Sequence, residues 1–237
     1  MKRAVPYDLH IHSCLSPCGD ADMTVNNIVN MALIKQLQLI ALTDHNSCKN
    51  CPAFLKVAQQ AGIAALPGME LTTEEEIHLV CLFPALENAM EFDRMVHARL
   101  MDIKNRPEIF GEQLILDEMD EVTGREETLL VGASSIGISE APGLVRAYGG
   151  LCFPAHIDRQ SYSVLSNLGQ IPPECGFCTV EVHDPLTFFA DGANAQIRAG
   201  YHILTNSDAH YLQDIAEPEQ FLHLEQLDFS GLAGALL

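Results

Sequence analysis

The sequence predicts an α/β fold, built as a βα barrel or as a doubly wound sheet. Short apolar runs that look like buried strands alternate with longer segments of helical periodicity. These runs are nearly continuous in aliphatic residues, which is typical of parallel strands covered on both faces. The expected strands are residues 5–12, 37–43, 63–67, 77–83, 150–155, 178–183 and 202–206.

Helical segments fill the gaps between these strands. Thr24 is a suitable N-cap for the first helix, and Ile28, Met31 and Ala32 form its apolar stripe. The second helix has a proline in its first turn, and Gly62 follows its last residue. The expected helices are residues 24–36, 52–61, 84–104 and one that begins near Pro142 and ends before Gly149.

Residues at about 93–137 do not follow the alternation of strand and helix. A charged stretch over residues 113–130, around Gly124, predicts a hairpin. We therefore expect one barrel domain over residues 1–237, with this segment as an insertion or cap. Its acidic group is expected on a solvated surface rather than in a separate metal site. The group consists of Asp117, Glu118, Asp120 and Glu121.

Composition restricts the partners and the location of the chain. Of the 237 residues, 48% are hydrophobic, which is enough for a sizeable core. No apolar run reaches the roughly 18 residues of a membrane span, and the first residues lack a signal-peptide pattern, so a cytoplasmic location is expected. The net charge of −19 argues against a long nucleic-acid track, which needs clustered Lys and Arg.

Eight cysteines include two CxxC pairs, Cys48 with Cys51 and Cys175 with Cys178. Two such pairs can form a structural zinc site, but these lie too far apart in the sequence for its usual compact spacing. We favour reduced, partly buried thiols over a shared zinc site.

The sharpest local feature is the run from Asp8 to His12. Side chains alternate along a strand, so Asp8, His10 and His12 point to one face, while Leu9 and Ile11 point to an apolar one. Two imidazoles on one face are a common chelating pair for Zn, Mn or Fe. Taken alone, the pair is equally consistent with two hydrogen-bonded histidines at a wet end of the barrel.

Further polar side chains stand at the edges of the other expected strands. Active-site groups of βα barrels lie at the carboxyl ends of strands, where such residues would meet. Together they exceed the ligands of one tetrahedral zinc, so several ions are expected. Paired ions about 3.5–4 Å apart suit the hydrolysis of phosphate esters. The residues are Asp44, His45, Glu70, His78, His156, Asp208 and His210.

The motifs DLHIHS, TDHN, GME, EIHLV, PAHIDR and SDAH occur in this order over residues 7–210. This combination resembles the polymerase-and-histidinol-phosphatase (PHP) family. The resemblance implies a distorted (β/α)7 TIM-like barrel, phosphoesterase activity and three divalent ions of manganese, zinc or iron. Carried over position by position, it implies one site of His10, His12, Glu70 and Asp208, and a second of Glu70, His78 and His156, with Glu70 bridging.

The third implied site consists of His45, His210 and an aspartate from the first loop. That loop is longer here than in the family pattern. Asp20 is preferred because Thr24 then aligns with the start of the helix, and Asp22 is the alternative. Cys14 and Cys18 lie in the same loop, close to the expected ligands, which suggests sensitivity to oxidation.

Other polar residues near the motifs are expected to assist. Asp8 and Asp44 could orient ligand imidazoles, and Asp44 could instead accept a proton. Arg159 and Lys49 could bind outer phosphate oxygens, and Arg159 is favoured because its guanidinium can bind two oxygens at once. His183 is weighed as a pocket residue. The remaining histidines, His97, His202 and His223, are expected to be structural or exposed.

The resulting hypothesis is hydrolysis of a small phosphomonoester, either a metabolite or a nucleotide, by activated water and without a covalent enzyme intermediate. One alternative is a 5'-3' exonuclease or oligonucleotide-trimming phosphodiesterase of the same family. Another is a metal-binding regulatory module without turnover. The sequence has no Walker, GxGxxG or HExxH motif, so NTPase, dinucleotide-binding and zincin readings lack support.

Overall fold

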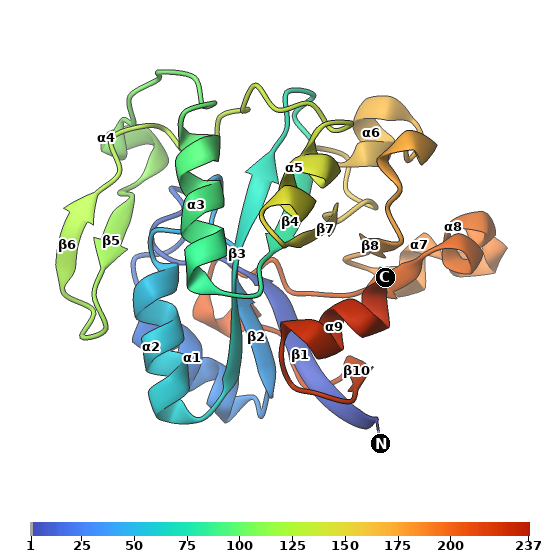
Figure 1. The fold of residues 1–237 in the computed structure, drawn as a ribbon, viewed down its shortest axis with the longest axis horizontal. Helices are drawn as coiled ribbons and strands as arrows, with labels where there is room; N and C mark the ends of the chain where they lie inside the picture. The colour runs from blue at the N-terminus through green and yellow to red at the C-terminus, as the bar shows by residue number, and fades with distance from the viewer. Residues whose placement is uncertain (1) are drawn as a thin grey trace.

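In the computed structural model, which describes residues 2–237, a curled mixed sheet carries the fold (Figure 1). Its strand order is β10-β1-β2-β3-β4-β7. The predicted domain boundary at residue 1 lies outside the described residues. The strands are β1 (Arg3–Ile11), β2 (Leu39–Leu42), β3 (Ala64–Thr72), β4 (His78–Leu82), β7 (Leu151–Pro154) and β10 (Phe221–Leu224).

The pairing is parallel from β1 through β3 and antiparallel from β3 through β7. The expectation of parallel strands separated by helices is therefore wrong at β4, which returns from β3 through a tight turn in which Thr73 N–H donates to Ile77 O (2.9 Å). A parallel pair, β8 (Thr179–Glu181) and β9 (His202–Leu204), continues the curl. Ile157 N–H donates to Glu181 O (2.9 Å), which joins the chain after β7 to β8.

The helices begin and end where local signals place them. Thr24 caps α1 by accepting a hydrogen bond from Asn27 N–H, and Gly62 ends α2 in a left-handed conformation. The helix α3 ends at His97, short of the expected residue 104. The helices are α1 (Val25–Ile34), α2 (Cys51–Ala61), α3 (Leu86–His97), α4 (Pro107–Phe110), α5 (Ala141–Ala147), α6 (Val164–Leu168), α7 (Pro185–Phe188), α8 (Ala195–Gly200) and α9 (Phe229–Leu236), with short 3-10 turns at Pro173–Cys175, Ala190–Gly192 and Leu212–Asp214.

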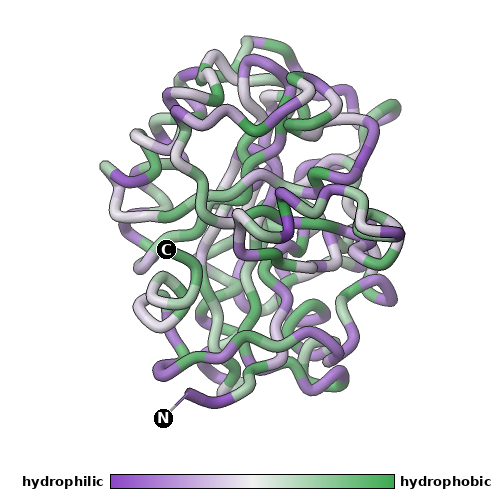
Figure 2. The backbone as a smooth tube through the Cα atoms, turned by 90° about the vertical axis from the view of Figure 1, so that its right-hand side faces the viewer, coloured by the Kyte–Doolittle hydropathy of each residue, from purple (hydrophilic) through white to green (hydrophobic). Residues whose placement is uncertain are grey.

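Two apolar clusters lie against the sheet. The larger contains Ile28, Phe54 and Phe92 from α1, α2 and α3. The smaller contains strand residues together with Leu232 and Leu236 of α9. Many of the outer loops are hydrophilic (Figure 2). Within residues 2–237, no helix combines the length and the apolar character needed to span a membrane.

The expected hairpin is present as β5 (Leu114–Leu116) and β6 (Val122–Arg125), beside the main sheet (Figure 1). Gly124 lies within β6, and the turn falls over residues 117–121. The acidic group is only partly solvated, because the Asp120 carboxylate accepts hydrogen bonds from Thr24 Oγ1 (2.7 Å) and Asn26 Nδ2 (2.9 Å). These contacts attach the hairpin to the start of α1.

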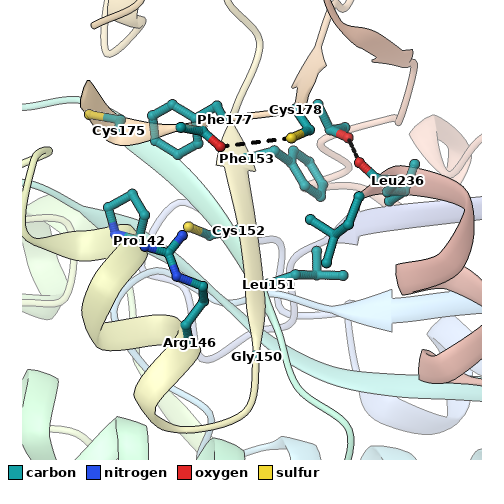
Figure 3. A pocket seen from close by; sticks show the side chains of 13 residues that line it. Pro142, Arg146, Gly150, Leu151, Cys152, Phe153, Cys175, Phe177, Cys178 and Leu236 are labelled. Atoms are coloured by element: carbon teal, nitrogen blue, oxygen red, sulfur yellow. Dashed lines mark hydrogen bonds between the residues drawn. The ribbon is translucent and has the colours of Figure 1, made fainter. Parts of the chain in front are cut away.

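The two CxxC pairs lie in different surroundings. Cys48 and Cys51 are buried, and their thiols face the carbonyl oxygen of Gly68. Cys175 and Cys178 line a narrow pocket between β7 and the end of α9 (Figure 3). All eight cysteines are free. Among the described residues, the groups that could hold a metal ion include none of these four thiols.

Candidate metal centre

A single carboxylate, that of Glu70 on β3, lies at the centre of a histidine cluster. Glu70 is completely buried, and five imidazole nitrogens lie within 3.3 Å of its two oxygens. These histidines come from β1, the ends of β2 and β7, and the start of β4. Oε1 lies 3.2 Å from His10 Nε2, 2.8 Å from His78 Nδ1 and 3.2 Å from His156 Nε2, and Oε2 lies 3.3 Å from His12 Nε2 and 2.9 Å from His45 Nδ1.

Asp208, after β9, approaches the same cluster from another side. Its Oδ1 lies 3.3 Å from His10 Nε2 and 3.2 Å from His12 Nε2. Its backbone is left-handed, with φ 53°, and that of His156 has φ 27°. Positive φ values are uncommon for residues other than glycine, and strained backbone conformations concentrate at functional sites.

The donors form three overlapping groups that could each hold an ion. Within each group the candidate ligand atoms lie within 4.8 Å of one another. Among the described residues, four buried atoms of the cluster make no hydrogen bond of acceptable geometry, although they are nitrogen and oxygen atoms of the kind that divalent cations bind. They are His45 Nδ1, Glu70 Oε2, His156 Nδ1 and Asp208 Oδ1. The residues therefore fit a metal centre. The groups are His10, His12, Glu70 and Asp208; His45, Glu70 and His78; and His12, His45 and His210.

Charge within the cluster opposes the effect of burial. Burial alone would lower the pKa of His10, but Glu181, Glu70 and Asp208 raise it well above 6.5. The pKa of Glu70 is held well below its usual range by the surrounding imidazoles, despite its burial. His78 behaves differently, since burial and neighbouring histidines lower its pKa to about 4.

Glu181 on β8 belongs to the site, although the sequence analysis did not include it. Both of its carboxylate oxygens lie 3.0 Å from His10 Nδ1, and it accepts hydrogen bonds from Asn206 Nδ2 (2.6 Å) and His156 N–H (2.9 Å). A carboxylate beside His10 Nδ1 keeps a proton on that nitrogen, which leaves Nε2 as the nitrogen that faces the centre and could bind an ion. The available signal was a lone acidic residue inside an apolar strand, which is seldom buried without a partner.

Asp44 organises the first loop. Its carboxylate accepts hydrogen bonds from Ser13 N–H, Ser13 Oγ and Ser16 Oγ, all at 2.7 Å. Ser16 Oγ in turn lies 2.9 Å from His12 Nδ1 and accepts a hydrogen bond from His45 N–H (3.1 Å). The carboxylate of Asp44 is therefore linked to the imidazole of His12 through the hydroxyl of Ser16.

The expectation for Asp8 requires a correction. Its carboxylate accepts hydrogen bonds from Ser207 Oγ (2.6 Å), Ser207 N–H (3.1 Å) and Ala216 N–H (3.0 Å) rather than from a ligand imidazole. Asp8 therefore anchors the loop that carries Asp208, and Glu181 is the residue that orients His10.

The two candidate cations have different surroundings. Arg159 Nη1 lies 2.9 Å from Asp208 Oδ2, and its side chain is 41% exposed, which places it at the rim of the cluster. Lys49 pairs instead with Glu126, the residue that follows β6. His183 is exposed and its N–H donates to Asp158, while the other three remaining histidines are exposed.

The first loop, residues 13–22, adds no ligand atom to the three groups found among the described residues. The Oδ1 atom of Asp20 accepts a hydrogen bond from Asp22 N–H (2.9 Å), and neither aspartate belongs to any of the three groups. Cys18 lies in the same loop, and the pKa of its thiol is affected by His45 and His210. Burial raises the pKa of this thiol, but the two histidines outweigh burial and lower it to about 5.

Comparison with known proteins agrees with this geometry. The model of the PHP domain matches residues 8–140, more than half of the chain. The chain belongs to the PHP domain family. It is 32% identical over 90 residues to an error-prone DNA polymerase of Symbiobacterium thermophilum, and 34% identical over 84 residues to the 5'-3' exoribonuclease Rnm of Salmonella typhimurium. The matches cover 8% and 28% of those proteins, so the chain corresponds to only a part of each.

Solved structures share the fold of this PHP chain at lower identity. The lesion-specific endonuclease PfuEndoQ of Pyrococcus furiosus aligns with a TM-score of 0.70 at 18% identity, over 99% of this chain and 56% of that one. A putative metal-dependent phosphoesterase of Bifidobacterium adolescentis aligns with a TM-score of 0.60 at 18% identity, over 99% and 96% of the two chains. An amidohydrolase of Chromobacterium violaceum aligns at 0.61 and 19%, over 98% and 97%.

Proposed function

We propose that this chain hydrolyses phosphate esters at a centre of three divalent metal ions. The observation that carries the proposal is the set of contacts around Glu70, whose two oxygens face five histidines from four strand ends. Because imidazole nitrogens surround both of its oxygens, the Glu70 carboxylate is positioned to bridge two metal ions. The proposed ligands are His10, His12, Glu70 and Asp208 for the first ion, Glu70, His78 and His156 for the second, and His45 and His210 for the third.

When bound, such ions would supply Lewis acidity toward phosphate oxygens and activate water. Other residues of the chain hold the ligand histidines in the orientation that metal binding requires. Glu181 holds His10 so that Nε2 faces the centre. Asp44 and Ser16 do the same for His12. Arg159, at the rim, can turn from Asp208 to bind an outer phosphate oxygen and so orient the ester.

The preferred substrate class is a small phosphomonoester, either a metabolite or a nucleotide. With 13 basic and 32 acidic residues, the chain has little positive surface for a long polyanion. A small phosphorylated anion could be bound by the metal centre and the guanidinium of Arg159 alone. The proposed ligands of the first two ions are all buried, which argues against a regulatory module without turnover.

A short oligonucleotide is the second candidate. The similarity to the exoribonuclease Rnm favours it, and so does the fold shared with PfuEndoQ. One to three terminal nucleotides would fit beside the centre without an extended basic track.

The test is a panel of a phosphomonoester, a phosphodiester, a dinucleotide and a short oligonucleotide, with metal-free protein reloaded with Mn²⁺, Zn²⁺ or Fe²⁺. We expect hydrolysis that depends on the metal and disappears in His10→Ala and Glu70→Gln. The exposed Glu225→Gln is the matched control and should leave the rate unchanged. Undiminished hydrolysis by metal-loaded His10→Ala would refute the proposal, and the preferred ester would decide between the two substrate classes.

A further inference from the structure

An exposed aromatic side chain packs against one of the proposed metal ligands. The ring of Tyr162 stacks on the imidazole of His78, with 4.7 Å between the ring centroids and 20° between the ring planes. His78 is buried, and its Nδ1 atom faces Glu70. Tyr162 therefore borders the metal centre without belonging to any of the three candidate ligand groups.

The backbone holds the tyrosine at this place. His78 N–H donates to the carbonyl oxygen of Tyr162 (2.9 Å), which joins the loop after β7 to the start of β4. The backbone of Tyr162 is left-handed, with φ 56°. Glycine or asparagine would adopt this conformation more easily, and strained positions concentrate at functional sites. The turn alone therefore does not account for a bulky aromatic residue at this position.

One face of the ring is open to solvent. Tyr162 is 43% exposed although the imidazole of His78 covers one face of its ring, so the exposed area lies on the opposite face and on the ring edge. Aromatic faces of this kind bind planar groups by stacking, and every nucleobase has a face that can stack in this way. The open face of Tyr162 is thus a platform for a planar ring beside the metal centre.

The same loop carries Arg159, which was proposed above to bind a phosphate oxygen. Arg159 N–H donates to His156 O (2.9 Å), and Ser163 Oγ donates to Arg159 O (2.7 Å), so hydrogen bonds fix the loop on both sides of the arginine. The guanidinium and the tyrosine ring, which both border the centre, therefore come from one short segment that is fixed to the ends of two strands.

We propose that Tyr162 selects phosphate esters that carry a nucleobase, by stacking on the base while the metal centre and Arg159 bind the phosphate group. This inference rests on the proposed function and refines it, because it favours a nucleotide over a metabolite without a planar ring. Stacking on a base requires no basic surface, which agrees with a chain of net charge −19.

The test compares adenosine 5'-monophosphate with ribose 5-phosphate, which carry the same phosphate on the same sugar and differ by the base. We expect the metal-loaded wild type to hydrolyse the nucleotide with a kcat/KM about 5–150-fold higher, the range expected from one stacked base. Tyr162→Leu should make the two esters nearly equal, whereas Tyr162→Phe keeps the ring and should keep the preference. The ratio of the two kcat/KM values cancels any common effect of a variant on His78, and the metal content of each variant is measured alongside.

The outcomes separate this inference from the proposed function. A wild type that hydrolyses both esters equally, or a Tyr162→Leu variant that keeps the preference, would overturn the role of Tyr162 in selection and leave the metal centre standing. Tyr162 would then only pack against His78.

A loaded wild type that hydrolyses neither ester still allows the inference to be tested, because calorimetric binding of the same two compounds then replaces the kinetics. Tighter binding of the nucleotide that is lost in Tyr162→Leu and kept in Tyr162→Phe would support the inference, and equal affinities would overturn it. Only the absence of hydrolysis across the whole ester panel would contradict the proposed function.

Discussion

Both carboxylate oxygens of Glu181 lie 3.0 Å from Nδ1 of His10, so two residues that are 171 positions apart in the sequence form one buried unit. Glu181 carries no expected metal ion itself, but it determines which imidazole nitrogen faces the centre. The pKa of Glu181 is lowered by His10, despite burial, so this carboxylate is ionised at neutral pH.

Glu181→Gln should therefore weaken metal binding without removing a ligand. A neutral amide can still accept a hydrogen bond, but it no longer favours the required tautomer by charge. We expect metal affinity to fall by about 10–100-fold, the usual range for such outer partners. Calorimetric titration of metal-free protein measures it, with Glu225→Gln as the control. An affinity equal to that of the wild type would show that Glu181 only fills space.

Metal binding should release protons. The pKa values of His10 and His45 are raised well above 6.5 by neighbouring carboxylates, although burial opposes this, so both imidazoles are protonated in the metal-free protein near pH 7. An ion must displace these protons, and its apparent affinity should increase with pH through the neutral range. Calorimetry in buffers of different ionisation enthalpy should detect the release, and a heat that is independent of the buffer would contradict it.

The raised pKa values of His10 and His45 also affect the stability of the metal-free protein, which should decrease with pH where the metal affinity increases. A histidine whose pKa is raised on folding stabilises the protein below its unfolded value of about 6.5, and this contribution is lost as the pH rises through the folded pKa. The Tm of metal-free protein should therefore fall as the pH rises above about 6.5. Saturating metal should remove this trend, since the bound histidines are then neutral at every pH tested.

Arg159 and Lys49 provide a matched pair of cation variants. Arg159→Ala removes the guanidinium beside Asp208 and should raise KM for a phosphomonoester by about 10–100-fold, the equivalent of one or two charged hydrogen bonds. Metal content should not change. Lys49→Ala breaks the pair with Glu126 and should leave KM as it is. Steady-state kinetics of both variants shows which of the two cations binds the phosphate group. A rise in KM for Lys49→Ala alone would assign phosphate binding to Lys49 instead of Arg159.

The sequence predicted the cluster because strand ends meet in space. His45, Glu70 and His156 each follow an apolar run, and the structure brings all three together. The antiparallel direction of β4 could not be predicted, because an apolar run records burial but no direction. Glu181 was missed for a different reason, since it acquires its role from a contact with His10, which lies far away along the chain.

The hairpin offers a test of stability that is independent of metal. Asp120 accepts hydrogen bonds from Thr24 Oγ1 and Asn26 Nδ2, and the hydroxyl of Thr24 also caps α1 by accepting from Asn27 N–H. Asp120→Ala removes these acceptors and places alanine at φ 62°, a backbone conformation that aspartate and asparagine tolerate better than alanine. We expect a loss of about 1–3 kcal/mol in the free energy of unfolding, measured by urea denaturation of metal-free protein. Asp120→Asn should cost less, because asparagine keeps one acceptor and tolerates this backbone, and the exposed Glu121→Gln should have no effect. Equal losses for alanine and asparagine would show that the negative charge, and not the geometry of the turn, attaches the hairpin to α1.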